Sequence, residues 1–333
     1  MNRMHKRALI TVALVGCASL LTSCLTLDGF VFNPIHCSTV GPSTCEESGN
    51  PTWDQACVPC EEPYDWTRTY DWIEGTLDDG TPSVRAVDAS SVVPLVILSD
   101  DGEAQLDAYY IPSHGGDPEL RNTTVLYNHG NYMGIEHYAP RARFLHEAGY
   151  AVLIWDYRGF GKSLPDAAPT TEQFLADALT VRAFAEGIVP DPSKLIVYAN
   201  SLGGIPAVEM SVGDPPCALM LEAAFTSMAR ISASNSGTSF GESMFTSNNF
   251  DNADKLRGYE GPLLMLVGDE DNFFPLEDER DLYDSAVGPK EFWVAEGAKH
   301  GISNGGVPEA GLTPYFAAMR SFLVEHAPGC LTP

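Results

Sequence analysis

Short, nearly continuous apolar runs alternate with amphipathic stretches from about residue 90 to the end of the chain. Six of these runs carry few charges: Thr124–Asn128, Ala151–Asp156, Lys194–Ala199, Ala218–Glu222, Pro262–Val267 and Glu291–Val294. Runs of this kind are typical of strands buried on both faces of a parallel sheet. Two earlier runs, Val92–Leu98 and Ala104–Ile111, flank Asp100-Asp101-Gly102 and predict an antiparallel hairpin.

Helical patterns separate the predicted strands. Thr170 and Gln173 have the spacing of a capping box, and Thr313-Pro314 predicts the start of a last helix. Each start is followed by apolar residues on one helical face: Phe174, Ala178 and Val181 in the first helix, and Tyr315, Met319, Phe322 and Leu323 in the second. The alternation predicts an α/β domain over residues 66–333, with a mostly parallel central sheet, helices on both faces and a short insert at about 223–261.

The N-terminus has the pattern of a secretory signal. Arg3, Lys6 and Arg7 precede an uncharged apolar run over residues 8–16, which is too short to span a bilayer. The tetrad Leu21–Cys24 that ends this segment resembles a bacterial lipobox. That resemblance implies a signal peptide over residues 1–23 and a lipid group on Cys24.

A second candidate lipobox, Leu14–Cys17, lies upstream, and the cysteine count favours Cys24 over it. Cleavage before Cys24 leaves an even number of cysteines for disulfides: Cys37, Cys45, Cys57, Cys60, Cys217 and Cys330. Cleavage before Cys17 would leave an odd thiol in an oxidising compartment. We therefore expect a bacterial cell-envelope protein, lipid-anchored on the periplasmic or cell-surface side.

A Cys-rich stretch over residues 24–65 has no hydrophobic periodicity and is rich in Pro, Gly, Ser and Thr, which predicts a tether. Within it, Cys57-Val58-Pro59-Cys60 is compatible with a redox or metal motif, but a zinc site needs four ligands, so structural disulfides are favoured. Cys217 and Cys330 lie far apart in sequence, and their pairing, which would attach the last helix to the domain, is a hypothesis.

The charge balance excludes some partners. The chain has 333 residues with 19 Lys+Arg and 45 Asp+Glu, a formal net charge of −26. Binding to nucleic acid needs basic surface, so we expect no nucleic-acid partner. A hydrophobic content of 44% is enough for a buried core and argues against disorder.

One serine stands at a predicted strand-to-helix turn. The strand ending at Tyr198 leads into Ala199-Asn200-Ser201-Leu202-Gly203-Gly204, and a helical segment follows. A nucleophile at such a turn has small residues two positions before and after it, because the strained turn brings neighbouring backbone close. The helix that starts behind the serine favours negative charge. Ser201 is therefore the predicted nucleophile, with Ala199 in place of the usual first glycine.

A serine hydroxyl needs a base, and the base needs an acid to orient it. Acidic residues follow the strand ending at Val267, and His300 follows the next strand, so the chain order is Ser, acid, His. This order distinguishes the α/β-hydrolase arrangement from other Ser-His-Asp proteins. Residues of about 90–327 thus resemble an α/β-hydrolase of the serine-hydrolase type. The family patterns Gly-x-x-Asp-x-x-apolar-Pro and Gly-x-x-His then imply Asp271 as the acid and His300 as the base. Asp269, Glu270 and Glu222 remain alternatives to Asp271 as the acid.

Two backbone N–H groups should hold the oxyanion. One follows the nucleophile, at Leu202. His129-Gly130-Asn131 resembles the His-Gly-x element of the fold, which implies the N–H of Asn131 as the second donor. His129 is an alternative base, but in the families that the chain resembles this histidine is structural. Asp156 and Arg158, in a stretch similar to the Asp-x-Arg-Gly-x-Gly-x-Ser of the superfamily, are expected to form a structural charge or hydrogen-bond pair.

The best resemblance is to minimal-cap hydrolases, which include protein depalmitoylating enzymes and carboxylesterases. It implies hydrolysis of a small-molecule or acylated substrate at a carboxylic ester or thioester through an acyl-enzyme. A serine peptidase or acyltransferase on the same triad, and a catalytically silent envelope binding protein, are the alternatives. None of these roles requires a metal or a cofactor, and we expect none.

Overall fold

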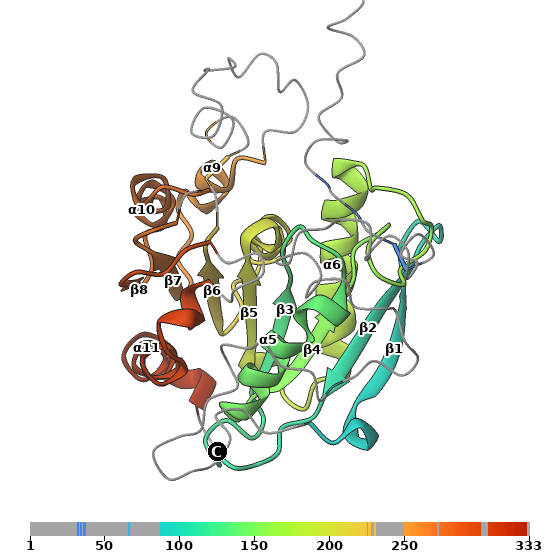
Figure 1. Ribbon diagram of the computed structural model, residues 1–333, viewed down its shortest axis with the longest axis horizontal. Helices are drawn as coiled ribbons and strands as arrows, with labels where there is room; N and C mark the ends of the chain where they lie inside the picture. Colours follow the sequence, from blue (N-terminus) through green and yellow to red (C-terminus); the bar gives the residue numbers. More distant parts are fainter. Residues whose placement is uncertain are drawn as a thin grey trace, which may run out of the picture.

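An eight-stranded sheet runs through the middle of the molecule, with helices on both faces (Figure 1). The computed structural model describes residues 87–224, 226–227, 230, 250–271, 273–300 and 306–331, with Phe32, Pro34, His36, Cys37 and Trp66. The strands are β1 (Val93–Leu98), β2 (Gln105–Ile111), β3 (Thr124–Asn128), β4 (Ala151–Trp155), β5 (Leu195–Asn200), β6 (Ala218–Glu222), β7 (Leu263–Gly268) and β8 (Lys290–Ala295).

The sheet order is β1-β2-β4-β3-β5-β6-β7-β8. The β1–β2 and β2–β4 pairs are antiparallel, and all other neighbours are parallel. This confirms the predicted N-terminal hairpin and the mostly parallel sheet. Strands β3, β4, β5, β6 and β7 are buried throughout, as their apolar runs predict, whereas β8 is an edge strand whose residues are mostly half-buried.

The helices divide between the two faces of the sheet. They are α5 (Ile135–Glu147), α6 (Thr171–Ile188), α7 (Gly204–Glu209), α9 (Asn252–Leu256), α10 (Leu276–Ser285) and α11 (Leu312–His326), with short 3-10 turns η1 (Ala89–Ser91), η2 (Pro192–Lys194), η3 (Ser201–Gly203), η5 (Val307–Ala310) and η6 (Pro328–Leu331). One core contains Phe174 of α6, Ile205 of α7 and Leu282 of α10. The other contains Phe144 of α5 and Phe322 of α11. Each sheet face is therefore covered by its own set of amphipathic helices.

Local signals in the sequence set where two helices start. The capping box of α6 is present: the Thr170 hydroxyl accepts from the Gln173 N–H, and the Gln173 side chain accepts from the Thr170 N–H. The last helix starts at Leu312, and its predicted stripe of Tyr315, Met319, Phe322 and Leu323 is buried.

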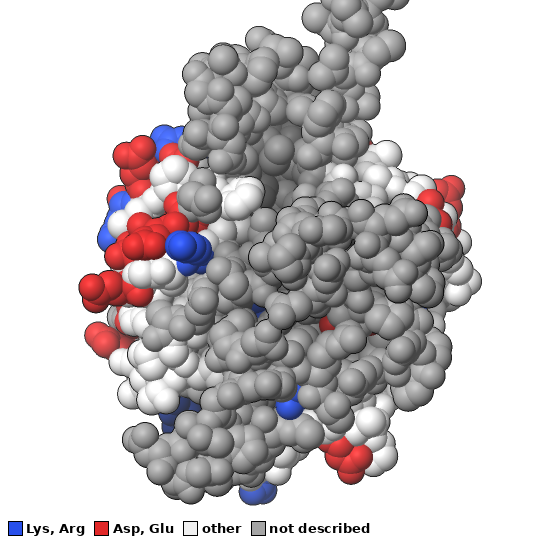
Figure 2. All heavy atoms as spheres, viewed as in Figure 1, with Lys and Arg blue, Asp and Glu red and all other residues white. Residues whose placement is uncertain are grey.

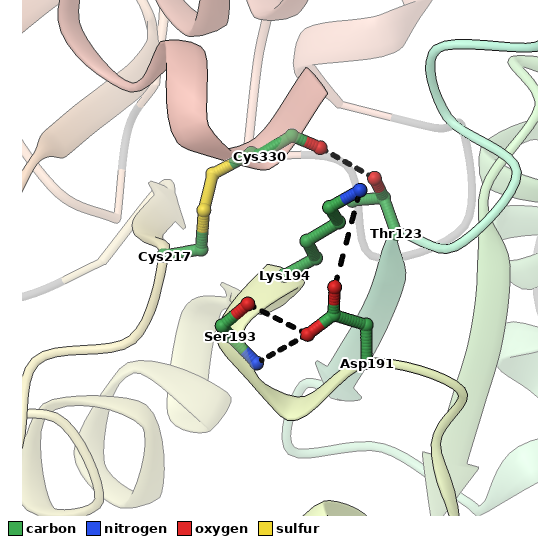
Figure 3. Close-up of a disulfide and its surroundings, with 6 residues drawn as sticks. All are labelled: Thr123, Asp191, Ser193, Lys194, Cys217 and Cys330. Carbon is green, nitrogen blue, oxygen red and sulfur yellow. Dashed lines mark hydrogen bonds and ion pairs between the residues drawn. A yellow bond between two sulfur atoms is a disulfide. The ribbon is translucent and has the colours of Figure 1, made fainter. Parts of the chain in front are cut away.

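A disulfide joins Cys217, directly before β6, to Cys330 in η6, so the hypothesis of this pairing holds (Figure 3). The Thr123 hydroxyl donates to the Cys330 carbonyl at 2.6 Å, and this bond also ties the C-terminal turn to the start of β3. Cys217 and Thr123 lie at the amino ends of their strands. The disulfide is therefore at the opposite end of the sheet from the loops that follow the strands.

The predicted signal peptide, Cys24, and Cys57 and Cys60 lie outside the described residues, as does most of the tether and of the insert. The part of the tether that is described packs against the domain. Phe32 is buried against the ring of Phe174, and the Cys37 N–H donates to the carbonyl of Gly161. No helix within the described ranges is long and apolar enough to cross a membrane.

Candidate active site

Ser201 occupies a sharp turn between a buried strand and a helix. It follows β5 directly, and the chain enters α7 three residues later. Its backbone has φ +54°, a left-handed conformation that residues other than glycine rarely adopt. Such strain persists only where the surrounding structure holds it, and it is common at functional sites. The turn leaves the side chain half-buried beyond the end of the sheet.

Close backbone contacts explain why small residues flank the serine. A Cβ added at Gly203 would lie 2.1 Å from the carbonyl oxygen of Asn128, at the end of β3. A Cβ added at Gly204 would lie 3.0 Å from the Cβ of Ala224. Ala199 is fully buried in β5. The turn can therefore form only with small residues at these positions, as the sequence pattern predicts.

Three side chains from three loops form a continuous hydrogen-bonded chain. The Ser201 Oγ lies 3.0 Å from the Nε2 of His300, and the His300 Nδ1 lies 2.8 Å from the Oδ2 of Asp271. The other carboxylate oxygen of Asp271 accepts the backbone N–H groups of Phe273 and Phe274 at 2.7 and 2.9 Å. The structure thus brings together the predicted nucleophile, base and acid across 99 residues of sequence.

Aromatic rings enclose the histidine. The Phe274 ring packs edge-on to His300 at 4.7 Å, and the Phe273 ring lies tilted at 5.0 Å. His300 and Asp271 are 9% and 8% exposed. Excluding water from such a chain strengthens its electrostatic interactions. Phe273 itself is 40% exposed, so one ring of this enclosure faces solvent.

None of the rival acids is hydrogen-bonded to His300. Asp269 accepts the backbone N–H of Gly297, and Glu270 is exposed. Glu222 is buried at the end of β6 in an ion pair with Arg141. Its other oxygen accepts the hydroxyls of Tyr198 and Tyr315. These partners use the hydrogen-bonding capacity of Glu222, so of the four candidates only Asp271 reaches the histidine.

The two predicted oxyanion donors follow neighbouring strands. Asn128 pairs with Ala199 across β3 and β5, so the loop of Asn131 and the turn of Leu202 leave the sheet side by side. The contact of Gly203 with the Asn128 carbonyl packs this loop directly against the turn. Asn131 is half-buried and Leu202 is buried.

His129 lies in the core rather than beside Ser201. Its ring is fully buried between the rings of Tyr138 and Tyr157, at 4.9 and 4.3 Å. Its Nδ1–H donates to the carbonyl of Gly130 at 2.8 Å, and its Nε2 lies 3.1 Å from the Oδ1 of Asp156. Burial lowers the pKa of His129 to about 3. This geometry is that of a structural histidine.

The prediction that Asp156 and Arg158 form a pair is wrong. Arg158 instead forms ion pairs with Asp177 of α6, at 2.6 Å, and with Asp101 of the hairpin, at 2.8 Å, whereas Asp156 faces His129. The two side chains follow the end of β4 and point into different surroundings. Sequence reasoning missed Asp177, although a carboxylate beside Ala178 on the apolar face of α6 is a signal of a buried partner.

Among the described residues, no group of three or more His, Cys, Asp or Glu side chains could hold a metal ion.

Acidic side chains are prominent around α10 on the face shown in Figure 2. Arg230 at the start of the insert pairs with two of them, Asp278 and Asp281.

Comparisons with known proteins identify relatives in sequence and in fold. Residues 121–247 match a family model described as a serine aminopeptidase of the S33 type. An uncharacterized protein of Mycobacterium tuberculosis is 29% identical over 217 residues, covering 64% of this chain and 75% of that relative.

Two solved structures share the topology. The esterase Pf2001 of Pyrococcus furiosus superimposes with a TM-score of 0.56 at 21% identity, covering 71% of this chain and 93% of that one. Est1E of Butyrivibrio proteoclasticus, solved with ferulic acid, also gives 0.56, at 20% identity over 70% of this chain and 98% of that one. At these identities the likeness establishes the fold.

Proposed function

The chain has the α/β-hydrolase fold, and from this premise we propose that it is a serine hydrolase that cleaves carboxylic esters or thioesters. One observation carries the proposal. Ser201, His300 and Asp271 form an unbroken chain of contacts of 3.0 and 2.8 Å at the carboxyl ends of the strands. A serine next to a base that is itself oriented by a carboxylate is the arrangement of an activated nucleophile.

Each of the three side chains has one role in the proposed mechanism. His300 takes the proton of Ser201 as the serine oxygen attacks the carbonyl carbon, and Asp271 stabilises the imidazolium that forms. The tetrahedral intermediate collapses to an acyl-enzyme, and His300 returns the proton to the leaving alcohol or thiol. Water then attacks the acyl group with His300 again as the base, and the acid product leaves.

The oxyanion of each tetrahedral intermediate is assigned to the N–H groups of Asn131 and Leu202. Support comes from the pairing of β3 with β5 and from the packing of Gly203 against the β3 carbonyl end. Removal of one such donor typically costs about 3–4 kcal/mol of transition-state stabilisation. Because backbone groups supply this hole, side-chain substitutions at Asn131 should matter less than changes to the loop itself.

Esters are favoured over amides because Pf2001, a solved structure of the same fold, is named as an esterase. The family model is described as an aminopeptidase, so a peptidase or an acyltransferase is the second candidate. A panel of an aryl ester, an acyl thioester and an aminoacyl anilide separates them. Hydrolysis of the anilide alone would contradict the ester proposal.

Intact mass after reaction with a fluorophosphonate is the central test. We expect one covalent adduct on the wild type and none on Ser201→Ala. Ser193→Ala is the matched control, because Ser193 is exposed just before β5, at the opposite end of the same strand. It should keep the adduct. An unlabelled but folded wild type would favour a catalytically silent binding protein.

A second intact-mass measurement tests the cellular location. We propose that the protein is anchored in the bacterial cell envelope through a lipid on Cys24, on the strength of the charged start, the apolar run and the lipobox-like tetrad. Protein from a bacterial membrane fraction should then have the mass of a chain that starts at Cys24 and carries a lipid on that residue. A chain that retains residues 1–23, or a soluble mature chain, would contradict the anchor.

A further inference from the structure

A buried histidine and a buried aspartate meet beside the loop that carries Asn131. Neither His129 nor Asp156 is exposed to solvent. The Nδ1 of His129 lies 2.8 Å from the carbonyl oxygen of Gly130, and a carbonyl oxygen can only accept. The hydrogen of a neutral His129 ring is therefore on Nδ1, and its Nε2 carries a lone pair.

That lone pair faces a second acceptor. The Nε2 lies 3.1 Å from the Oδ1 of Asp156, and it has no hydrogen-bond partner. An ionised carboxylate would also be an acceptor, and two acceptors in contact without water repel each other. One extra proton on either group removes the repulsion. Burial raises the pKa of Asp156 to about 8, so the carboxyl can hold this proton at neutral pH.

The contact also determines the orientation of one peptide group. The Gly130 carbonyl and the Asn131 N–H belong to the same peptide, which is trans and planar, so the two groups point in opposite directions. With the carbonyl held on the His129 ring, the N–H must point away from it. The preceding carbonyl, that of His129, is held by the Tyr157 hydroxyl at 2.6 Å.

We propose that Asp156 holds one buried proton, which it shares with the His129 Nε2 only as a hydrogen-bond donor, and that this pair positions the Asn131 N–H for the oxyanion. The inference rests on the proposed function. His129 and Asp156 are positioning residues, since neither touches the serine. The shared proton keeps the ring in the tautomer that donates to Gly130, and the Gly130–Asn131 peptide then stays in one orientation through the reaction.

The surroundings of the pair set its pH response. The Asp156 carboxylate faces His129, the backbone N–H of Ile135 at 2.9 Å and the charge of Lys162, while the His129 ring is covered by Tyr138 and Tyr157. The N–H donation and the Lys162 charge lower the pKa of Asp156, but the burial of the carboxyl raises it by more. With the pKa of Asp156 raised to about 8 by burial, its carboxyl holds the proton below that pH and loses it above. The Asn131 N–H should then lose its orientation on the alkaline side.

The experiment measures kcat and KM with a soluble aryl ester across this pH range for the wild type, His129→Ala and His129→Asn. His129→Ala should lower kcat about 10- to 100-fold, below the full cost of losing one oxyanion donor, and leave KM nearly unchanged. His129→Asn should recover most of the loss, because its amide N–H can still donate to the Gly130 carbonyl. The alkaline fall in kcat of the wild type should be absent from His129→Asn.

Two further measurements separate the outcomes. Nitrogen NMR of the His129 ring should show a proton on Nδ1 and none on Nε2 at neutral pH; the opposite tautomer overturns the inference. His114→Ala is the matched control, since His114 is exposed and contacts the Glu147 carbonyl. It should leave kcat unchanged.

The inference and the proposed function fail differently. If the wild type is not labelled by the fluorophosphonate and hydrolyses no ester, the proposed function is wrong. A wild type that does both, while folded His129→Ala keeps its kcat or the wild-type kcat stays flat above the expected pH, overturns only the positioning role of the pair.

Discussion

At the scale of single residues, fixed backbone groups decide which acid serves the histidine. One oxygen of Asp271 is held by the N–H groups of Phe273 and Phe274, and the other faces His300. Charge-assisted hydrogen bonds of this kind are stronger than neutral ones and hold the carboxylate in one orientation. Asp269, two residues earlier, points instead to the loop of Gly297.

We expect Asp271→Asn to lower kcat by about 10³- to 10⁴-fold, because an amide cannot hold His300 in the productive tautomer and stabilise its charge. Steady-state hydrolysis of an aryl ester measures the effect. Asp269→Asn is the matched control from the same loop, and it should stay close to the wild type since an amide oxygen can still accept from Gly297. Near-normal activity of Asp271→Asn would move the acid to Asp269, Glu270 or Glu222.

At the scale of elements, the site depends on how closely the turn after β5 approaches β3. The two strands pair in parallel, and Gly203 lies against the Asn128 and His129 carbonyls. This contact places the nucleophile turn next to the loop of Asn131. Helix packing supports it from behind, because α7 is buried in the core that also contains the apolar face of α6.

Gly203→Ala should therefore destabilise the fold by about 1–3 kcal/mol and reduce activity, because its Cβ would meet backbone that has no alternative position. Gly187→Ala is the control, since Gly187 is in α6 with open space around its Cβ position. It should stabilise the protein by about 0.5 kcal/mol. Urea unfolding measures both, and equal effects of the two substitutions would contradict the close approach.

At the scale of the whole molecule, one covalent link joins distant parts of the chain. The Cys217–Cys330 disulfide closes a loop with a sequence separation of 113 residues and fastens the turn after α11 to the start of β6. The functional loops lie at the other end of the strands. The link therefore acts on stability rather than on the chemistry of the site.

The variant Cys217→Ser/Cys330→Ser should lose about 2–5 kcal/mol of unfolding free energy, mainly because the unfolded chain regains the freedom of a long loop. Denaturation with and without reductant measures this. Reductant should destabilise the wild type but have much less effect on the double variant. Unchanged stability of the double variant would show that the link contributes little, and its kcat under native conditions should remain near the wild type.

The order of the elements and the position of the serine turn follow from local patterns in the sequence. Alternation of apolar runs with helical stripes depends on local periodicity, so it is readable without the fold; β3 spans Thr124–Asn128, as predicted. The turn at Ser201 is equally local, since its small neighbours lie within a few residues. The edge position of β8 cannot be predicted in this way, because it depends on how the strands are ordered in the sheet and not on the residues of β8 alone.

The partners of the polar side chains, in contrast, depend on the packing of distant elements. Asp269 and Asp271 stand in the same loop with the same chemistry, and the backbone path beyond the strand selects one of them for His300. Arg158 pairs with Asp177 and Asp101, residues that neighbour it only after α6 and the hairpin have packed. Periodicity acts over one element, whereas ion pairs, the disulfide and the contacts of His129 form between elements and depend on how the whole chain is packed.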